Sequence, residues 1–207
     1  GEKIPVIFRP WHEHNGWWFW WGKGHCSEED YVSIWKFTVN YLSVEKGIDN
    51  LLYAYSPWSS ISARIHSRED YLYGYPGDEY IDILGLDNYY DLRQYATSMR
   101  KFVKGLEIAV SIANEKNKPA ALMETGAFTL FGKATMPEKD WFTEKLLKGI
   151  MHSEITRQIS YVMVWRNENT GHFHAPYPGH PSVPDFLEFY NNPHILFMSD
   201  INKNSYE

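Results

Sequence analysis

Short apolar runs alternate with longer amphipathic stretches along this chain of 207 residues. The apolar runs are bounded by Pro, Gly or polar residues and contain β-branched and aromatic side chains, a pattern typical of buried strands. Strands are predicted at residues 4–8, 50–55, 80–86, 120–123 and 159–164. Because these runs alternate with helical stretches, the chain is predicted to form an α/β fold with a parallel sheet.

The helices between the strands carry recognisable end signals. Ser27 is followed by three acidic residues and predicts a helix start, and Lys46-Gly47 predicts the end of the same helix. The clearest amphipathic pattern runs from Leu92 to about Asn117 and is stopped by Pro119. Further helices are predicted at 138–157 and 184–190, and residues 59–78 are predicted to form a long polar loop.

Polar and aromatic side chains gather directly after the predicted strands. They are His12 and Glu13, Ser56, Asp87 and Tyr89, Glu124, and Trp165 and Arg166. A (β/α)8 barrel places its chemistry at the carboxyl ends of its strands in this way. A doubly wound sheet usually carries a Gly-rich phosphate turn, and neither G-x-G-x-x-G nor a P-loop occurs here. The chain is therefore predicted to form a (β/α)8 barrel, and since only five of eight strands are found, either three βα units are absent or the sheet is open.

Composition narrows the classes of ligand that the chain is expected to bind. The chain contains 9 Trp, 15 Tyr and 11 Phe, and its net charge of -6 gives no electrostatic footprint for nucleic acid or an anionic membrane. Cys26 is the single cysteine, so an intrachain disulfide is excluded. No apolar run is long enough for a transmembrane helix. A neutral polymer such as a polysaccharide fits this charge balance.

The segment Arg9–Gly22, R-P-W-H-E-H-N-G-W-W-F-W-W-G, combines ionisable residues with five aromatic rings in a row. Neither helical nor strand periodicity buries all five rings. Exposed indole rings beside a carboxylic acid indicate a sugar-binding cleft, because pyranose rings stack on aromatic faces. The alternative for any single tryptophan is an ordinary place in the core.

Two carboxylic acids, Glu13 and Glu124, each end a buried apolar run, where a charge is costly unless it has partners or a task. Glycoside hydrolysis uses two such groups on either side of the scissile bond, and in a retaining enzyme they lie about 5–5.5 Å apart. On strands of one sheet with aromatic neighbours, the two acids are predicted to be catalytic.

Several segments together resemble glycoside hydrolase family 26, the β-mannanase family. They are R-P-W-H-E-H-N-G-W-W-F-W-W-G, I-L-G-L-D-N-Y-Y, M-E-T-G, V-W-R-N and H-F-H-A-P-Y-P-G-H, in that order. The resemblance implies a (β/α)8 barrel that hydrolyses internal β-1,4-mannosidic bonds of mannan, galactomannan or glucomannan with retention. It needs no cofactor and no metal, and its partner is a β-mannan chain.

The resemblance also implies roles for individual residues. Glu13 matches the acid/base and Glu124 the nucleophile. Supporting and sugar-binding roles are implied for His12 beside the acid/base, Tyr89 bonded to the nucleophile, Trp165 on the floor of the cleft, Asp87 and Arg166 near sugar hydroxyls, and Trp18 and Trp21 as stacking rings. Burial is expected to raise the pKa of Glu13, and Tyr89 is expected to keep Glu124 ionised.

If residues 4–8 form barrel strand four, strands one to three should precede Gly1. Residues 1–207 are then predicted to be the C-terminal part of one catalytic domain, of which strands four to eight are visible. Because a polysaccharide is degraded outside the cell, a secreted, cell-surface or periplasmic protein of bacterial type is expected, with a removed signal peptide upstream.

Three alternatives remain open at this stage. His12 and His14, like His172 and His174, form H-x-H pairs that would chelate zinc from an extended strand. This alternative is disfavoured, because no H-E-x-x-H occurs and the acid between His12 and His14 falls on the opposite face of such a strand. A sugar-binding protein without catalysis is a second alternative. Within the family, a mixed-linkage β-glucan or a β-1,3-xylan is a third, because the preference for mannan depends on contacts that these motifs do not reveal.

Overall fold

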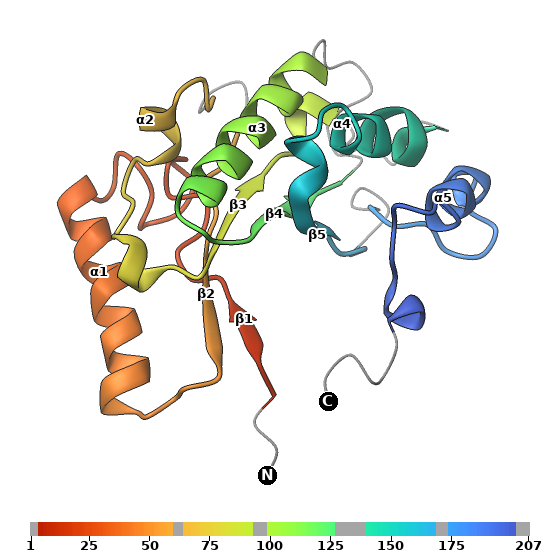
Figure 1. Cartoon of the computed structure of the whole chain (residues 1–207). Helices are drawn as coiled ribbons and strands as arrows, with labels where there is room; N and C mark the ends of the chain where they lie inside the picture. The colour runs from red at the N-terminus through yellow and green to blue at the C-terminus, as the bar shows by residue number, and fades with distance from the viewer. Residues whose placement is uncertain (1–3, 60–63, 93–98, 127–139, 169–173, 202–207) are drawn as a thin grey trace.

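Five parallel strands form one sheet in which the spatial order follows the chain order (Figure 1). The computed structural model describes residues 4–59, 64–92, 99–126, 140–168 and 174–201. The strands are β1 (Val6–Phe8), β2 (Leu51–Tyr55), β3 (Ile83–Asp87), β4 (Ala120–Thr125) and β5 (Ile159–Val164). The sheet is half of a barrel, so the predicted α/β class and its parallel strands are confirmed.

A helix or helical segment follows each strand, and these helices cover one face of the sheet (Figure 1). They are α1 (Glu28–Asn40) with a π-helical extension (Tyr41–Glu45), α2 (Arg68–Tyr71), α3 (Met99–Glu115), α4 (Lys148–Ile150) preceded by a π-helical segment (Phe142–Leu147), and α5 (Val183–Tyr190). Short 3-10 turns lie at Asp78–Tyr80, Tyr90–Leu92, Thr156–Gln158 and Met198–Asp200. Among the described residues, no helix is both long and apolar enough to cross a membrane.

The predicted ends of the first helix are confirmed. The Ser27 hydroxyl accepts a hydrogen bond from the Asp30 amide, and Gly47 adopts a φ of 63°, which favours glycine. The predicted loop 59–78 is partly wrong, because its described portion contains α2. A capping box causes this helix: the side chains of Ser67 and Asp70 each bond the other residue's amide.

Two other helix predictions hold only in part. The start of the predicted helix 92–117 falls on residues 93–98, outside the described residues, and α3 occupies the rest. Within 138–157 the described chain forms the π-helical segment and α4 and then turns at Met151, so one continuous helix is wrong there.

Side chains of the central strands alternate between two faces. Tyr53, Tyr55, Leu84, Leu86 and Leu122 point to the helices and join the main core. Ala54, Ile83, Ala121 and Met123 form a smaller cluster on the opposite face, with Tyr161 packed against it. This alternation is the ordinary period of a strand covered on both sides.

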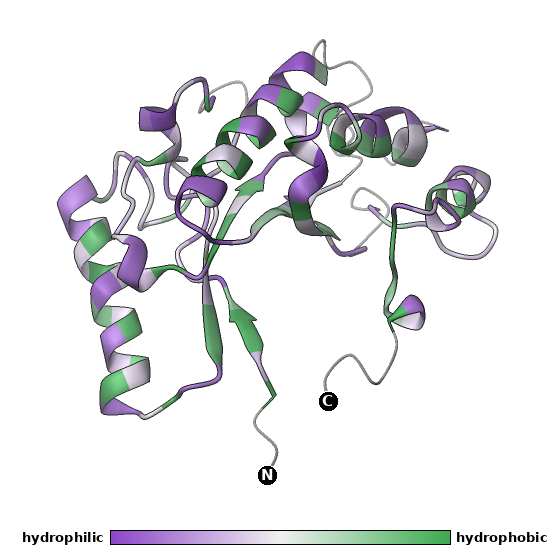
Figure 2. Ribbon diagram, viewed as in Figure 1, coloured by the Kyte–Doolittle hydropathy of each residue, from purple (hydrophilic) through white to green (hydrophobic). Residues whose placement is uncertain are grey.

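Strand β1 is not buried, which corrects the prediction for residues 4–8. Ile4, Val6 and Ile7 are 69%, 46% and 46% exposed, although β1 and β2 are apolar along most of their length (Figure 2). The physical reason is position, because β1 is an edge strand and only β2 pairs with it among the described strands.

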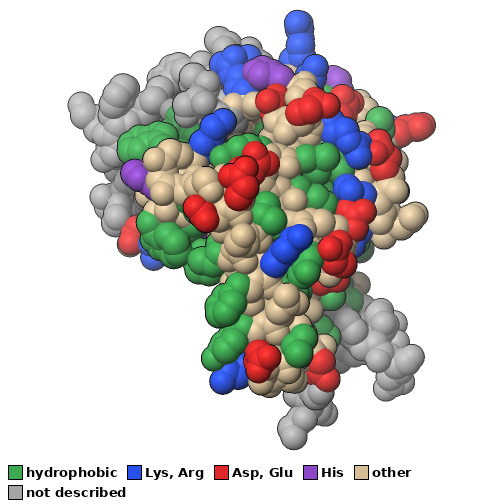
Figure 3. All heavy atoms as spheres, turned by 90° about the vertical axis from the view of Figure 1, so that its left-hand side faces the viewer, with side chains coloured by type: hydrophobic (Ala, Val, Ile, Leu, Met, Phe, Trp, Pro, Cys, Tyr) green, Lys and Arg blue, Asp and Glu red, His purple; other side chains and the backbone are tan. Residues whose placement is uncertain are grey.

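Hydrophobic side chains also alternate with charged ones on the surface that carries α1 and α2 (Figure 3).

A change of register between β3 and β4 matters for the site. Leu86 pairs with Leu122, but the next partners are Asp87 and Glu124, so β4 gains one residue at this point. Strict alternation from Ala120 and Leu122 would turn Glu124 toward the helices. A bulge re-aims the side chains that follow it, and here it places Glu124 beside Asp87.

Candidate active site

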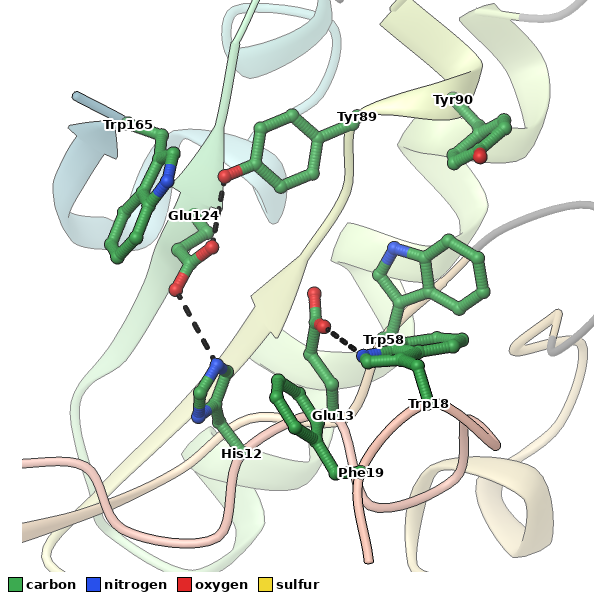
Figure 4. A pocket seen from close by; sticks show the side chains of 9 residues that line it. All are labelled: His12, Glu13, Trp18, Phe19, Trp58, Tyr89, Tyr90, Glu124 and Trp165. Carbon is green, nitrogen blue, oxygen red and sulfur yellow. Dashed lines mark hydrogen bonds and ion pairs between the residues drawn. The ribbon is translucent and has the colours of Figure 1, made fainter. Parts of the chain in front are cut away.

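A cleft of about 470 Å³ lies at the carboxyl ends of all five strands (Figure 4). The segment after β1 supplies four of its lining residues, and the segments that follow β2, β3 and β5 and the end of β4 supply the others. The lining residues are His12, Glu13, Trp18, Phe19, Trp58, Tyr89, Tyr90, Glu124 and Trp165. Aromatic rings therefore form most of the wall around two carboxyl groups.

The two carboxyl groups face each other across the cleft (Figure 4). One carboxylate oxygen from each of Glu13, Asp87 and Glu124 lies within 4.8 Å of the others, and all three residues are buried. A retaining glycosidase holds its two acids about 5–5.5 Å apart, whereas an inverting one needs about 6.5–9.5 Å to admit a water molecule. The separation of Glu13 and Glu124 fits the retaining geometry.

Glu124 is surrounded by donors and positive charge. The Tyr89 hydroxyl donates a hydrogen bond to Glu124 Oε2 at 2.8 Å, and the Arg9 guanidinium donates to Glu124 Oε1. The His12 ring nitrogen Nε2 lies 3.9 Å from the same Oε1 (Figure 4). A carboxylate that accepts charge-assisted bonds on both of its oxygens is held in one orientation.

Arg9 connects three segments beneath the cleft. Its guanidinium donates to Asp87 Oδ2 at 2.7 Å and to Ser56 Oγ at 2.9 Å, besides Glu124. The Arg9 side chain is 14% exposed, and the Asp87 side chain is fully buried. A buried guanidinium between two carboxylates fixes both of them, because its planar fork sets the direction of each bond.

Glu13 occupies a constrained backbone position. Its φ of 54° is in the left-handed region, which a residue with a side chain adopts at a cost and which recurs at functional sites. The Glu13 amide donates to the Ser56 carbonyl at 3.0 Å, and the Gly16 amide donates to the Glu13 carbonyl at 2.9 Å. These bonds hold the turn that lifts the Glu13 side chain into the cleft.

The environment of Glu13 favours its protonated form. Burial and the nearby charge of Glu124 raise the pKa of Glu13 to about 7, although the hydrogen bond from Trp18 and the charge of Arg9 act in the opposite direction. Like charges this close do not all ionise at neutral pH. Burial and the charge of Arg9 also lower the pKa of His12 to about 4, so His12 is neutral and offers no second cation. The pair therefore combines a proton-holding Glu13 with a Glu124 held by donors.

A family model for glycosyl hydrolase family 26 matches residues 1–129, more than half of the chain. The chain belongs to glycosyl hydrolase family 26. The resemblance found in the sequence motifs is confirmed at the level of the family.

Curated relatives carry the name mannan endo-1,4-beta-mannosidase. The protein of that name from Bifidobacterium adolescentis is 34% identical over 213 residues, which cover 98% of this chain and 21% of that protein. The one from Bacillus subtilis is 32% identical over 173 residues, which cover 81% of this chain and 40% of that protein. The chain thus spans less than half the length of these two relatives.

Solved structures agree with the fold. GH26C from Muricauda sp. superposes with a TM-score of 0.88 at 36% identity, over 98% of this chain and 52% of that one. A GH26 beta-mannanase from Bacteroides ovatus gives a TM-score of 0.82 at 43% identity, over 95% of this chain and 53% of that one. The half-barrel matches part of a family 26 barrel, and the chain spans about half the length of these solved relatives.

The structure brings most of the predicted site residues of this family 26 chain together. His12, Glu13, Trp18, Tyr89, Glu124 and Trp165 all line the cleft. The predicted bond from Tyr89 to Glu124 and the raised pKa of Glu13 are both present. Their catalytic and sugar-binding roles stay predictions.

Three predicted sugar contacts lie elsewhere. Asp87 is fully buried, pairs with Arg9 and is not among the residues that line the cleft, so its predicted contact with sugar hydroxyls stays a prediction. Trp21 stacks on Phe19 with ring centres 4.2 Å apart and donates its indole N–H to the His12 carbonyl. Trp21 therefore packs against two residues that line the cleft and does not line it itself. Arg166 is exposed, pairs with Glu168 at 3.1 Å and does not line the cleft.

Sequence reasoning missed several residues of this site. The sequence pattern indicates Arg9 only as the first ionisable residue of the segment Arg9–Gly22 and Ser56 only as a polar residue after a strand, and it assigns no separate role to Phe19, Trp58 or Tyr90. A cation directly after an apolar strand is the signal that indicates Arg9 as a site residue. Such a cation lies near the residues that follow the other strands, because the carboxyl ends of parallel strands meet at one edge of the sheet. Its partners are 78 and 115 residues away in sequence, so pattern alone does not name them.

His12 and His14 do not form the zinc pair that was one alternative for their H-x-H motif. Residues 10–15 form turns rather than an extended strand, so the two rings do not share a face. His14 is 1% exposed, stacks on Tyr31 with ring centres 4.2 Å apart and bonds the Tyr73 carbonyl at 2.5 Å. Burial lowers the pKa of His14 to about 4. In the second pair, His172 lies outside the described residues.

Proposed function

We propose that the protein hydrolyses internal β-1,4-mannosidic bonds of β-mannans with retention of configuration. The observation that carries this proposal is the pair of buried carboxyl groups, within 4.8 Å of each other and in opposite electrostatic environments. The family and the printed names of its relatives support the reaction class. The aromatic wall supports a sugar substrate, because indole and phenol rings stack on pyranose faces.

The first step forms a glycosyl-enzyme. A Glu124 carboxylate oxygen attacks the anomeric carbon while the bond from that carbon to the leaving sugar oxygen breaks. The leaving oxygen takes the proton from Glu13, which becomes a carboxylate. The donors Arg9 and Tyr89 aim Glu124 at the carbon, and burial keeps the proton on Glu13 until the leaving oxygen needs it.

The second step releases the sugar. The Glu13 carboxylate takes a proton from water, and the water oxygen attacks the anomeric carbon as its bond to Glu124 breaks. Glu124 returns to a carboxylate and Glu13 to an acid. Two inversions at one carbon leave the configuration unchanged.

The substrate preference is also part of the proposal. Trp18, Trp58 and Trp165 offer apolar faces to sugar rings, and the chain has a net charge of -6, which suits a neutral polymer. Mannan is chosen over mixed-linkage β-glucan and β-1,3-xylan because the relatives are named mannan endo-1,4-beta-mannosidases. A polymer too large to enter a cell also supports export of the protein to the cell surface or medium.

The test measures release of reducing ends from β-mannan, with β-glucan and β-1,3-xylan in parallel. It is run on the 207-residue chain and on a longer natural chain, because this one spans about half of its solved relatives. Glu124→Ala should lower turnover roughly 10³-fold or more, since it removes the nucleophile. The exposed Glu144→Ala is the matched control and should keep full activity.

Azide rescue assigns the two roles separately. With an activated aryl mannoside, azide should restore turnover in Glu124→Ala and give the α-mannosyl azide after one inversion. In Glu13→Ala it should give the β-mannosyl azide after two inversions. Exchanged products would reverse the assignment. Binding of mannan by the longer chain without any release of reducing ends would favour a non-catalytic sugar-binding protein.

A further inference from the structure

Trp18 presents its polar edge, rather than only its face, to the cleft. The indole N–H donates a hydrogen bond to Glu13 Oε2 at 2.9 Å (Figure 4). The second oxygen of the Glu13 carboxyl group points away from Trp18 and toward the space between Tyr89 and Glu124. The two oxygens of the acid therefore have different partners before any substrate is present.

The indole is fixed on two sides. A Cβ atom at Gly16 would lie 2.1 Å from the six-membered ring of Trp18, so the chain must have glycine there to let the ring pack against the backbone. On another side the ring meets Trp58 edge-on, with ring centres 4.3 Å apart at 82°. Trp18 therefore has little freedom to turn its N–H away from Glu13.

Trp58 is itself held firmly. It is 8% exposed, and the Asn15 side-chain amide bonds both of its backbone groups, donating to the Trp58 carbonyl at 2.7 Å and accepting from its amide at 2.8 Å. Asn15 belongs to the segment after β1, and Trp58 follows β2. A continuous set of contacts thus runs from the second strand to one oxygen of Glu13.

We propose that Trp18 is a positioning residue that occupies Glu13 Oε2 and thereby leaves the transferable proton on Oε1, the oxygen that faces the cleft. An oxygen that accepts an N–H bond is the unprotonated one of a carboxylic acid, so the proton resides on the other oxygen. This inference rests on the proposed function of Glu13 as acid/base.

The consequence is specific to steps that need the acid. Without the indole N–H, the Glu13 carboxyl group is free to rotate and to place its proton on either oxygen, so proton transfer to a sugar leaving group slows. A leaving group that departs without a proton does not depend on this orientation. The hydrogen bond from Trp18 stabilises the ionised form of Glu13 and so lowers its pKa. Removal of that hydrogen bond therefore raises the pKa of Glu13.

The experiment replaces Trp18 by Phe, which keeps an aromatic ring and removes the N–H. A second variant carries benzothienylalanine at position 18, which keeps the bicyclic shape without a donor. Trp20→Phe is the matched control, because Trp20 is 60% exposed and does not line the cleft. Turnover is measured on mannan and on an activated aryl mannoside, over a range of pH.

Both position-18 variants should lose about tenfold in kcat on mannan, with a smaller change in KM, and keep most of their kcat/KM on the aryl mannoside, because kcat/KM reports the first step and that step needs no proton for this leaving group. In the pH profile of kcat/KM on mannan, the alkaline limb of both variants should move up by about one pH unit. The alkaline limb of Trp20→Phe should stay in place. An equal loss on both substrates, or a change in KM alone, would overturn the proposal and leave Trp18 as a sugar platform.

A readout without turnover separates this inference from the proposed function. The Glu13 carboxyl carbon is followed by ¹³C NMR against pH in the full chain, and Glu13→Gln identifies its signal. The position-18 variants should titrate at higher pH than the unchanged protein even if neither hydrolyses mannan. An unchanged titration would overturn the proposal for Trp18 whatever the enzyme assays show.

Discussion

Arg9→Met tests whether the buried guanidinium holds the site together. The substitution keeps an unbranched side chain but removes the charge between Asp87 and Glu124, whose side chains are 0% and 6% exposed. Carboxylate oxygens of these two residues lie within 4.8 Å of each other, and two like charges at that distance or less repel by at least about 3.5 kcal/mol at an effective dielectric constant of about 20. Mutations that break one side of a buried ion pair cost about 3–5 kcal/mol. We therefore expect the free energy of unfolding to fall by about 3–5 kcal/mol at pH 7.

The loss should depend on pH. Burial already raises the pKa of Asp87, and Arg9 opposes this rise. Without Arg9 the pKa of Asp87 in the folded state lies further above its value in the unfolded chain, so the folded state binds more protons. Stability gained from such a group is present at low pH and is lost as pH rises through the folded-state pKa. The deficit of Arg9→Met should therefore be smaller at pH 5 than at pH 8.

Urea unfolding followed by tryptophan fluorescence at several pH values measures both effects. Arg68→Met is the matched control, because Arg68 and Glu115 form an exposed ion pair with side chains 43% and 57% exposed. Exposed pairs contribute less than about 1 kcal/mol. A deficit for Arg9→Met that equals the Arg68→Met deficit and does not change with pH would refute the reasoning.

Four further results are expected. Tyr89→Phe removes the 2.8 Å bond to Glu124 and should lower kcat/KM on mannan about 10- to 100-fold, and an unchanged value would exclude a role for that bond. Because Glu13 must be protonated to act and its pKa is about 7, kcat/KM should fall as pH rises through about 7. Glu124→Gln removes a neighbouring charge and should lower the pKa of Glu13 in a ¹³C NMR titration. The pKa of His14 is about 4 in the folded state, below its ordinary value of 6.5. The free energy of unfolding should therefore fall by up to about 3 kcal/mol as pH drops from 6.5 toward 4. Urea titrations of His14→Phe should lack this pH-dependent loss.

Local patterns in the sequence were enough for most of the framework. Residues 159–164 were predicted as a strand with the bounds that β5 has, and Ser27 and Gly47 mark the ends of the first helical segment as expected. These features depend on hydrophobic runs and on short-range hydrogen bonds. The exposure of β1 depends instead on which strands lie beside it, and an apolar run looks the same at an edge and in the middle of a sheet.

The site was predictable by position but not by geometry. Residues after parallel strands meet at one edge, which is why Glu13 and Glu124 were brought together as expected. The bulge that turns Glu124 onto the cleft face adds one residue to β4, and nothing in A-A-L-M-E-T signals it. The burial of Asp87 and the edge-on contact of Trp18 with Glu13 likewise depend on long-range packing, so the sequence placed these residues near the cleft without revealing which atoms face it.

The asymmetry between the two acids also explains how one residue can serve first as acid and then as base. Burial is the largest cause of the raised pKa of Glu13, and the charge of Glu124 is the second. In the proposed mechanism Glu124 loses that charge when it forms an ester with the sugar. The pKa of Glu13 then falls, because the repulsion that favoured its proton is gone, while Trp18 and Arg9 continue to stabilise the ionised form. Glu13 is thus protonated when the leaving group needs a proton and ionised when water must give one up, without any movement of the backbone.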